Sequence, residues 1–227
     1  TTKMNVPITE FFIENCYSND FKGKRVLEVG SKYVNGGVRP LIEKFLMPAE
    51  YIGVDIEKGK YVDIVLDAEK LVEYFSKESF DIVITTELLE HVLNWRKIIN
   101  NMKEVLKKDG YIYITTCSKG FPHHAYPYDF WRYEIEDMKE IFKDFEIIRL
   151  QKDPEVAEVF MKAKKPKNYI KPINLSEISL YSIIIGKRTK EIITTFPILR
   201  KMRLFFMIRS FSFIVLIIST QSFAQDG

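Results

Sequence analysis

The chain has 227 residues, of which 46% are hydrophobic and 29% charged, a composition that excludes a disordered protein and allows a sizeable buried core. Its net charge of +3 is too small to indicate nucleic acid as a partner. The two cysteines, Cys16 and Cys117, lie far apart without the spacing of metal ligands, which predicts a reduced cytoplasmic protein that holds no metal. No secretory signal is expected at the start of the chain.

The first residues predict a short helix over residues 8–17 and a buried strand over residues 25–29, which is aliphatic and lacks helical spacing. The strand ends at Gly30, where the backbone can turn without a Cβ, and a loop with two further glycines follows. Apolar residues at helical spacing over residues 38–46, with Pro40 in the first turn, predict a helix. A strand, a glycine loop and a helix open a nucleotide-binding α/β sheet, although a tight turn alone could also require Gly30.

Two further predicted strands each end in an acidic residue. The strand over residues 51–55 ends at Asp55, whose carboxylate could accept hydrogen bonds from both hydroxyls of a ribose, or could instead cap a helix or form a turn. The strand over residues 61–68 contains Asp67, which could accept a hydrogen bond from an adenine amine or cap a helix over residues 69–75. At this point both alternatives stay open for each residue.

The remaining pattern continues the alternation of strands and helices. It predicts strands over residues 80–86 and 111–116, a helical turn over 87–92, helices over 95–107 and 134–142, an aromatic loop over 118–132, and a closing pair of strands over 145–150 and 158–163. The helix over residues 95–107 is expected to end in basic residues and a glycine, at residues 107–110. Such alternation predicts a mostly parallel sheet with helices on both faces.

An ordered set of short motifs resembles the class I methyltransferases that use S-adenosylmethionine, in particular the small type 11 methyltransferase-domain group. The resemblance runs over about residues 21–163, and its motifs are Val26-Leu-Glu-Val-Gly30, Tyr51-Ile-Gly-Val-Asp55, Leu66-Asp67-Ala68, Phe80-Asp-Ile-Val-Ile84, Glu87-Leu-Leu-Glu-His91-Val92 and Leu106-Lys-Lys-Asp-Gly110. It implies a Rossmann-like, doubly wound, mostly parallel sheet of seven strands whose last strand is antiparallel. It also implies S-adenosylmethionine as the cofactor, lying across the carboxyl ends of the first strands.

The resemblance further implies which residues contact the cofactor. Glu28 and Gly30 would border its methionine part, Asp55 its ribose, Asp67 and Ala68 its adenine, and Thr86 and Glu87 its sulfonium. The usual second glycine of the loop is Lys32 in this sequence, so Asn35 and its neighbouring glycines are expected to serve instead. The full set of predicted cofactor contacts is Glu28, Gly30, Ser31, Asn35, Asp55, Ile56, Asp67, Ala68 and Thr86.

The three histidines all fall in loops expected at the ligand end of the sheet, so His91, His123 and His124 are candidate general bases, with Glu87 as a candidate for orienting the acceptor. Each histidine has an alternative: His91 could only pack beneath its loop, and one of the other two is expected to be solvated. A segment that resembles part of the family group predicts an acceptor-pocket wall and lid containing Tyr128, Asp129, Trp131 and Arg132. Asp129 and Arg132 could instead form an ion pair that pins the loop.

The predicted function is S-adenosylmethionine-dependent methyl transfer to an oxygen or nitrogen of a small-molecule or glycan-type acceptor. The alternative is a non-catalytic S-adenosylmethionine-binding module of the same fold. A nicotinamide-dependent oxidoreductase is disfavoured because the loop after Gly30 lacks the Gly-x-Gly-x-x-Gly spacing.

The end of the chain differs in composition from the rest. From residue 187 onward there are seven basic and two acidic residues, so this part carries about +5 and the preceding part about −2. We therefore predict a methyltransferase domain over residues 1–186 and a tail over residues 187–227. The apolar stretch over residues 204–218 is too short to span a bilayer. It resembles a misplaced signal peptide and is expected to be an artefact or a helix on a membrane surface, which would give weak peripheral membrane contact.

Overall fold

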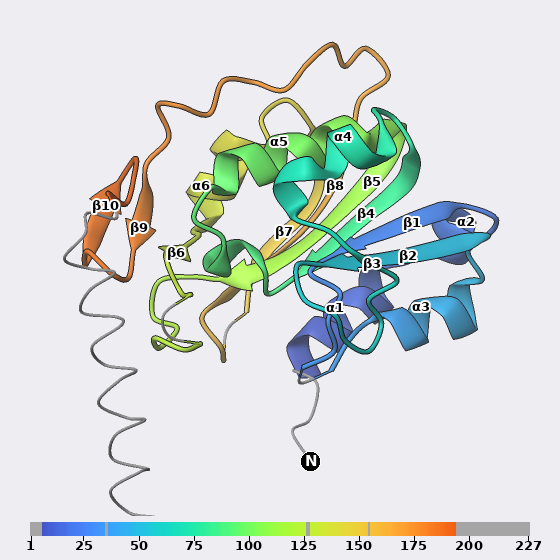
Figure 1. Ribbon diagram of the computed structural model, residues 1–227, viewed down its shortest axis with the longest axis horizontal. Helices are drawn as coiled ribbons and strands as arrows, with labels where there is room; N and C mark the ends of the chain where they lie inside the picture. Colours follow the sequence, from blue (N-terminus) through green and yellow to red (C-terminus); the bar gives the residue numbers. More distant parts are fainter. Residues whose placement is uncertain (1–5, 35, 126–127, 154, 194–227) are drawn as a thin grey trace, which may run out of the picture. The chain divides into compact units, whose positions relative to one another are not determined.

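The computed structural model describes residues 6–34, 36–125, 128–153 and 155–193. The chain divides into two compact units, residues 1–190 and 191–227, and the elements below belong to the first. Its centre is a seven-stranded sheet (Figure 1), in the order β3 (Ile64–Val65), β2 (Glu50–Asp55), β1 (Arg25–Val29), β4 (Phe80–Thr86), β5 (Leu106–Cys117), β8 (Glu158–Lys164) and β7 (Glu146–Lys152).

The pairing of these strands confirms the predicted fold class. β1 pairs in parallel with β2 and β4, β2 with β3, and β4 with β5. β8, the last strand of this sheet along the chain, runs antiparallel to both of its neighbours, β5 and β7. The sheet is therefore doubly wound and mostly parallel, and the carboxyl ends of β1, β2 and β4 lie at one edge, where open sheets of this kind bind ligands.

Helices cover both faces of the sheet (Figure 1). On one face lie α1 (Val6–Asn15), α2 (Ser18–Phe21) and α3 (Arg39–Leu46), and on the other lie α4 (Leu71–Phe75), α5 (Trp95–Val105) and α6 (Ile135–Ile141). α5 forms because its apolar side chains recur at helical spacing, which buries Ile98, Ile99 and Met102 against the strands. α6 begins with a capping box in which the side chains of Glu134 and Asp137 bond the opposite backbone N–H groups.

The aromatic core on the α1 face attaches the first helix to the antiparallel side of the sheet. Phe11 lies with its ring centre 5.4 Å from that of Phe160 on β8, and Phe12 stacks on Tyr113 of β5 at 5.7 Å. All four side chains are buried. Aromatic pairs at these distances add to the free energy gained from burial alone, so α1 is held over the strand ends by ring packing.

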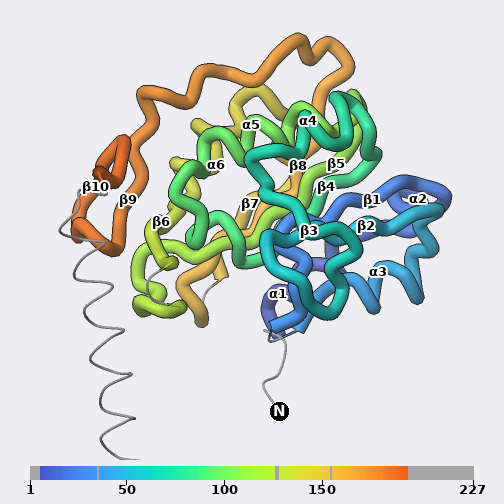
Figure 2. The backbone as a smooth tube through the Cα atoms, in the orientation of Figure 1, coloured from blue at the N-terminus to red at the C-terminus, as the bar shows by residue number. Residues whose placement is uncertain are grey.

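A second, three-stranded sheet lies next to the aromatic loop. It consists of β10 (Lys187–Thr189), β9 (Leu180–Ser182) and β6 (Trp131–Arg132), all antiparallel. Figure 2 shows the chain after β8 returning past α4, α5 and α6 before it reaches β9. Arg96 of α5 holds this returning segment through a 2.8 Å hydrogen bond from Nε to the carbonyl oxygen of Leu175. The sequence patterns predicted neither these strands nor their pairing.

Two strands differ most clearly from the predicted bounds. The third strand covers only Ile64–Val65, because Tyr61 has a φ of 68° and cannot continue an extended strand. β5 already begins at Leu106, and the predicted turn at 107–110 is an irregularity within it where the register shifts and Asp109 has a φ of 63°. β9 and β10, which lie on either side of the predicted domain boundary after residue 186, pair with each other, and the first compact unit ends at Lys190.

No helix within the described ranges has the length and apolar character needed to cross a membrane. The predicted membrane-surface helix of the tail falls among residues 194–227, which are outside the described part of the chain.

The Phe12→Ala variant is expected to lose about 3–5 kcal/mol of its free energy of unfolding, because truncating this ring leaves a cavity beneath α1. The neighbouring Ile13 is 61% exposed, so Ile13→Ala should change the free energy by less than about 0.5 kcal/mol. Urea unfolding of the two variants measures both values. Equal losses would contradict the packing role of the Phe12 ring.

Candidate functional site

The loop after β1 turns at Gly30 and packs against the segment after β4. Gly30 has a φ of +80°, and a Cβ built on it would lie 3.1 Å from the side chain of Leu88. The N–H groups of Gly30 and Ser31 both donate to the carbonyl oxygen of Val54 on β2, at 2.9 and 3.0 Å. A left-handed backbone and a close neighbour together explain why glycine occupies this position.

The carboxylate of Asp55 lies at the tip of β2 and faces this loop. Its Oδ2 accepts a 3.1 Å hydrogen bond from the backbone N–H of Lys32, and its Oδ1 accepts one of 3.0 Å from the backbone N–H of Glu57. The first bond joins the two strand ends, and the second forms a local turn. Lys32, which replaces the expected glycine, supplies the backbone donor and pairs its ammonium group with Glu57.

Two cavities open on either side of this junction. One has a volume of about 630 Å³ and the other about 510 Å³, both within the range of small-molecule sites. They share five lining residues, which are Gly30, Asp55, Glu57, Leu88 and His91. The larger cavity is also bordered by predicted site residues from β1, β4 and the aromatic loop, which are Glu28, Ser31, Thr86, Glu87 and His124. The smaller is bordered by the predicted residues Ile56, Asp67, Ala68 and Tyr128.

The structure thus brings together most of the predicted cofactor contacts. Asp67 borders the smaller cavity, and its side chain also caps the following 3₁₀ turn, η1 (Ala68–Lys70), by accepting a 2.9 Å hydrogen bond from the N–H of Glu69. The capping alternative is therefore observed, and one carboxyl oxygen makes that bond. Asn35, the remaining predicted contact, lies outside the described residues.

Glu28 is a buried acid in the middle of the first strand. Its side chain is 3% exposed, and Oε2 accepts a 2.9 Å hydrogen bond from the hydroxyl of Tyr51. Burial raises the pKa of Glu28 to about 7, although the hydrogen bond from Tyr51 and the charge of Arg39 act in the opposite direction. This carboxyl group at the cavity wall therefore changes its charge near neutral pH.

Glu87 follows β4 in an unusual backbone conformation. Its φ is 49°, a left-handed value that is uncommon for residues other than glycine and is found often at functional sites. Oε1 is buried without a hydrogen-bond partner, and Oε2 lies 3.3 Å from the thiol of Cys117. Burial, followed by the charges of Glu90 and Glu158, raises the pKa of Glu87 well above its ordinary value, so a protonated carboxyl group is favoured there.

Two of the three histidines meet at the larger cavity. The rings of His91 and His124 are 4.8 Å apart, and both residues line this space. Nδ1 of His91 lies 2.5 Å from the carbonyl oxygen of Tyr128. A carbonyl only accepts, so Nδ1 carries the hydrogen and Nε2 keeps its lone pair. His123 lines neither cavity, and its Nε2 lies 4.0 Å from Asp129.

The predicted pocket wall separates into one exposed and three buried residues. Tyr128 is exposed and lines the smaller cavity, whereas Asp129, Trp131 and Arg132 are buried and line neither. Arg132 binds Asp129 through two hydrogen bonds of 2.5 and 2.9 Å, and the indole N–H of Trp131 donates to the carbonyl oxygen of Leu93. This geometry matches the alternative of an ion pair that pins the loop. Asp129, Trp131 and Arg132 therefore lie behind the cavity wall and are not part of it.

The Asp129–Arg132 pair also acts on His124. Oδ2 of Asp129 accepts from the backbone N–H of His124 at 2.9 Å and lies 3.2 Å from its Nδ1. The carboxylate of Asp129 raises the pKa of His124, against a smaller opposing effect of burial. Burial by itself would raise the pKa of Asp129, but Arg132 and His124 hold it well below the ordinary value. The pair therefore positions the imidazole and favours its cationic form.

The site also contains several residues that were not predicted from the sequence. Leu88, Phe121 and Glu158 line the larger cavity, and Cys117 contacts its acidic wall. Leu88 is part of the motif that runs from Glu87 to Val92, and this membership was the one sequence signal that could have indicated it. Phe121 and Glu158 enter only because the loop and the antiparallel strand return to the ends of β4 and β5.

A family model described as a methyltransferase domain matches residues 8–152. The chain belongs to the methyltransferase-domain family. The match spans strands β1 to β7 and includes every residue that lines the two cavities except Glu158. The predicted resemblance to class I methyltransferases is thereby confirmed, together with S-adenosylmethionine as the cofactor of this class.

Named relatives of this methyltransferase domain include enzymes acting on nitrogen and on oxygen. The (S)-coclaurine N-methyltransferase of Thalictrum flavum subsp. glaucum is 25% identical over 109 residues, which cover 48% of this chain and 30% of that protein. The ubiquinone biosynthesis O-methyltransferase of Glaesserella parasuis serovar 5 (strain SH0165) is 29% identical over 118 residues, 46% of this chain and 50% of that protein. The chain thus spans half or less of the length of these relatives.

A solved structure supports the same fold. The S-adenosylmethionine-dependent methyltransferase from Mesorhizobium loti superposes with a TM-score of 0.52 at 14% identity, covering 69% of this chain and 96% of that one.

Glu28→Gln in this methyltransferase domain is expected to remove part of the pH dependence of stability. With a folded-state pKa of about 7 against an ordinary 4.5, Glu28 keeps its proton between those values while the unfolded chain releases it. The free energy of unfolding should therefore fall as the pH rises through this window, by about 3 kcal/mol from this residue. Urea unfolding across the window should show the variant gaining that stability relative to the wild type.

Glu73→Gln, which neutralises an exposed carboxylate on α4, is the matched control and should follow the wild-type profile. Parallel profiles for wild type and Glu28→Gln would show that Glu28 ionises as freely in the folded protein as in the unfolded chain.

Proposed function

We propose that this protein transfers a methyl group from S-adenosylmethionine to an oxygen or nitrogen of a small-molecule or glycan-type acceptor. The observation that carries the proposal is the junction between Asp55 and the N–H of Lys32, which holds a carboxylate against the glycine loop between two ligand-sized cavities. A charged acceptor of hydrogen bonds at the end of the second strand suits the two hydroxyls of a ribose.

Residues around the junction fit the remaining parts of the cofactor. The hydroxyl of Ser31 is buried at the larger cavity without a hydrogen-bond partner, as expected of a group reserved for a ligand. Glu28, Gly30 and Ser31 would hold the methionine part, and Ile56, Asp67 and Ala68 would contact the adenine side. Thr86 and Glu87 would lie between these and the acceptor. In this arrangement S-adenosylmethionine supplies a methyl group already activated on a sulfonium.

The acceptor side of the cavity supplies groups for orientation and proton transfer. We assign the general base to Nε2 of His91, because Nδ1 donates to the carbonyl oxygen of Tyr128 and the other nitrogen is left basic. His124, paired with Asp129, is favoured as a cation and would orient the acceptor or stabilise charge. Glu87, with its raised pKa, would donate a hydrogen bond from a neutral carboxyl group.

The other predicted roles change with their positions. His123 contributes to the cluster around Asp129 and would support His124. Tyr128 would contact a ligand directly, whereas Asp129, Trp131 and Arg132 would position the loop that carries it. The proposal keeps the division into a methyltransferase domain over about residues 1–186 and a tail, a cytoplasmic location and no nucleic-acid partner. The alternative of a non-catalytic binding module shares the cofactor site and differs only in the absence of turnover.

Asp55→Ala is expected to weaken binding of S-adenosylhomocysteine by about ten- to a hundredfold, the loss of one or two hydrogen bonds to a charged group. Isothermal titration calorimetry measures the two dissociation constants. Glu73→Ala removes an exposed carboxylate far along the chain on α4 and should bind as the wild type does. Equal affinity of wild type and Asp55→Ala would remove the assignment of the ribose site.

His91→Gln is expected to lower the rate of methyl transfer by about 10²–10⁴-fold while leaving S-adenosylhomocysteine affinity nearly unchanged, because the variant loses a proton acceptor and keeps the cofactor junction. Transfer of labelled methyl groups from S-adenosylmethionine into a small-molecule extract, resolved by chromatography, measures the rate. A binding-competent wild type that labels nothing would favour the non-catalytic module, and a fully active His91→Gln would exclude this residue as the base.

A further inference from the structure

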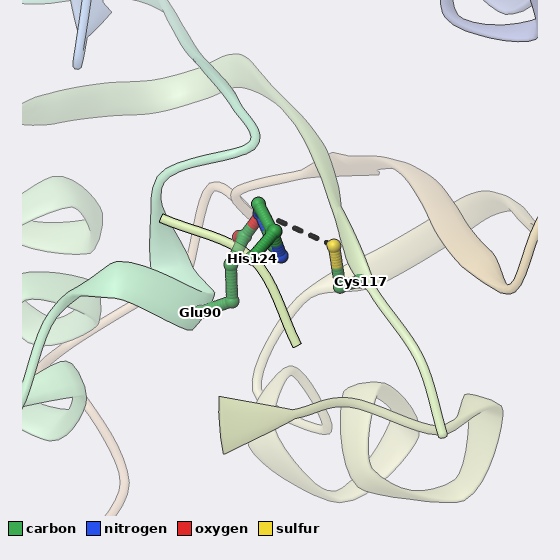
Figure 3. Close-up of side chains that lie close together, drawn as sticks. All are labelled: Glu90, Cys117 and His124. Atoms are coloured by element: carbon green, nitrogen blue, oxygen red, sulfur yellow. Dashed lines mark hydrogen bonds between the residues drawn. The ribbon is translucent and has the colours of Figure 1, made fainter. Parts of the chain in front are cut away.

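Behind the acceptor wall, three potential metal ligands from separate segments converge. They are Glu90 in the 3₁₀ turn η2 (Leu89–His91), Cys117 at the end of β5, and His124 in the aromatic loop (Figure 3). One carboxylate oxygen, the sulfur and one ring nitrogen all lie within 4.8 Å of one another. Ligand atoms around a tetrahedral zinc ion lie about 3.3–3.8 Å apart, so a contraction of up to about 1.5 Å would complete the geometry.

The hydrogen-bonding capacity of this cluster is not balanced. The thiol of Cys117 lies 3.3 Å from a carboxyl oxygen of Glu87 and 3.3 Å from one of Glu90, but it has a single hydrogen and can donate to only one of them. Glu90 and Cys117 are fully buried, and Oε1 of Glu87 is buried without a partner. Oε2 of Glu90 accepts a 2.9 Å hydrogen bond from the hydroxyl of Thr116, so the under-paired atoms are Oε1 of Glu87 and the carboxyl oxygen that the thiol does not reach. Buried oxygens without donors are costly, and a cation beside them would offset that cost.

The environment of His124 is that of a histidine prepared for coordination. Its Nδ1 lies 3.2 Å from Oδ2 of Asp129, which is in turn bound by Arg132. Metal-binding histidines commonly direct one ring nitrogen to a carboxylate, which fixes the tautomer and leaves the other nitrogen for the ion. The buried ion pair of Asp129 and Arg132 thus lies beside the ring of His124, and one ring nitrogen of His124 lies within 4.8 Å of the ligand atoms of Glu90 and Cys117.

We propose that Glu90, Cys117 and His124 form a binding site for a divalent cation of the zinc class. Thiolate and imidazole donors select zinc-like ions over magnesium and calcium, which prefer oxygen ligands alone. Binding would release the thiol proton of Cys117, and any proton on the coordinating nitrogen of His124, to solvent. Three protein ligands leave a fourth position, and because His124 lines the larger cavity the ion would be reached from the acceptor side.

Titration of the full-length, reduced protein with Co²⁺ tests this site. The expected result is one Co²⁺ per chain, with sulfur-to-cobalt charge-transfer absorption and tetrahedral d–d bands that Zn²⁺ displaces. Cys117→Ser should abolish the charge-transfer band, and Glu90→Gln and His124→Gln should weaken binding by more than about tenfold, at least the effect of losing an outer-shell partner. The test needs no cofactor or acceptor, so its outcome is separate from that of the methyl-transfer proposal.

Cys16→Ser is the matched control, since Cys16 is the other buried cysteine and lies on the α1 side of the core. It should retain both the band and the affinity. Thermal unfolding without metal checks that each variant folds. If Cys117→Ser fails to fold, the His124→Gln variant tests the site instead, because His124 is partly exposed and its substitution disturbs the core less. Absence of charge-transfer absorption in the wild type, its persistence in Cys117→Ser, its loss in a folded Cys16→Ser, or unchanged affinity in His124→Gln would overturn the proposal.

Discussion

The hydrogen bond from the backbone N–H of Lys32 to the carboxylate of Asp55 joins the ends of β1 and β2, and the candidate site is arranged around this junction. It requires close backbone approach. A Cβ on Gly53 of β2 would lie 2.2 Å from the carbonyl oxygen of Tyr61 and 2.6 Å from the hydroxyl of Ser31. The glycine therefore lets the loop after β1 and the segment before β3 lie against the same strand, which places both cavities at its tip.

Acidic groups concentrate at the larger cavity and next to it, and the protein compensates their burial in different ways. Glu28 receives a hydrogen bond from Tyr51, and Glu90 receives one of 2.9 Å from the hydroxyl of Thr116. Glu87 has a partner for one oxygen only and a left-handed backbone. The energetic cost of a left-handed backbone is tolerated where many surrounding contacts hold the residue in that conformation. The backbone N–H of Glu87 donates to the carbonyl oxygen of Thr115 on β5 at 3.0 Å, which holds the under-paired carboxyl group at the larger cavity.

The acceptor side is built from parts of the chain that are distant in sequence. The aromatic loop is held from beneath by the ion pair of Asp129 and Arg132, and β6 within it pairs with β9 about 50 residues later. β9 is in turn held to α5 through the segment that Arg96 binds. The returning segment therefore supports the aromatic loop without contacting the junction at Asp55, so the proposed acceptor side and the proposed cofactor side are held by different parts of the chain.

The sequence by itself determined the order of strands and helices, the glycine turn and the acidic residue at the end of β2, because these depend on local periodicity and on backbone conformations that few residues adopt. It left open whether Asp129 and Arg132 contact a ligand or each other, and it assigned no role to Cys117. Only the tertiary structure decided those points. A side chain's partner depends on which strand ends and loops meet in space, and the contacts of Cys117 with Glu87 and Glu90 join residues about 30 positions apart along the chain.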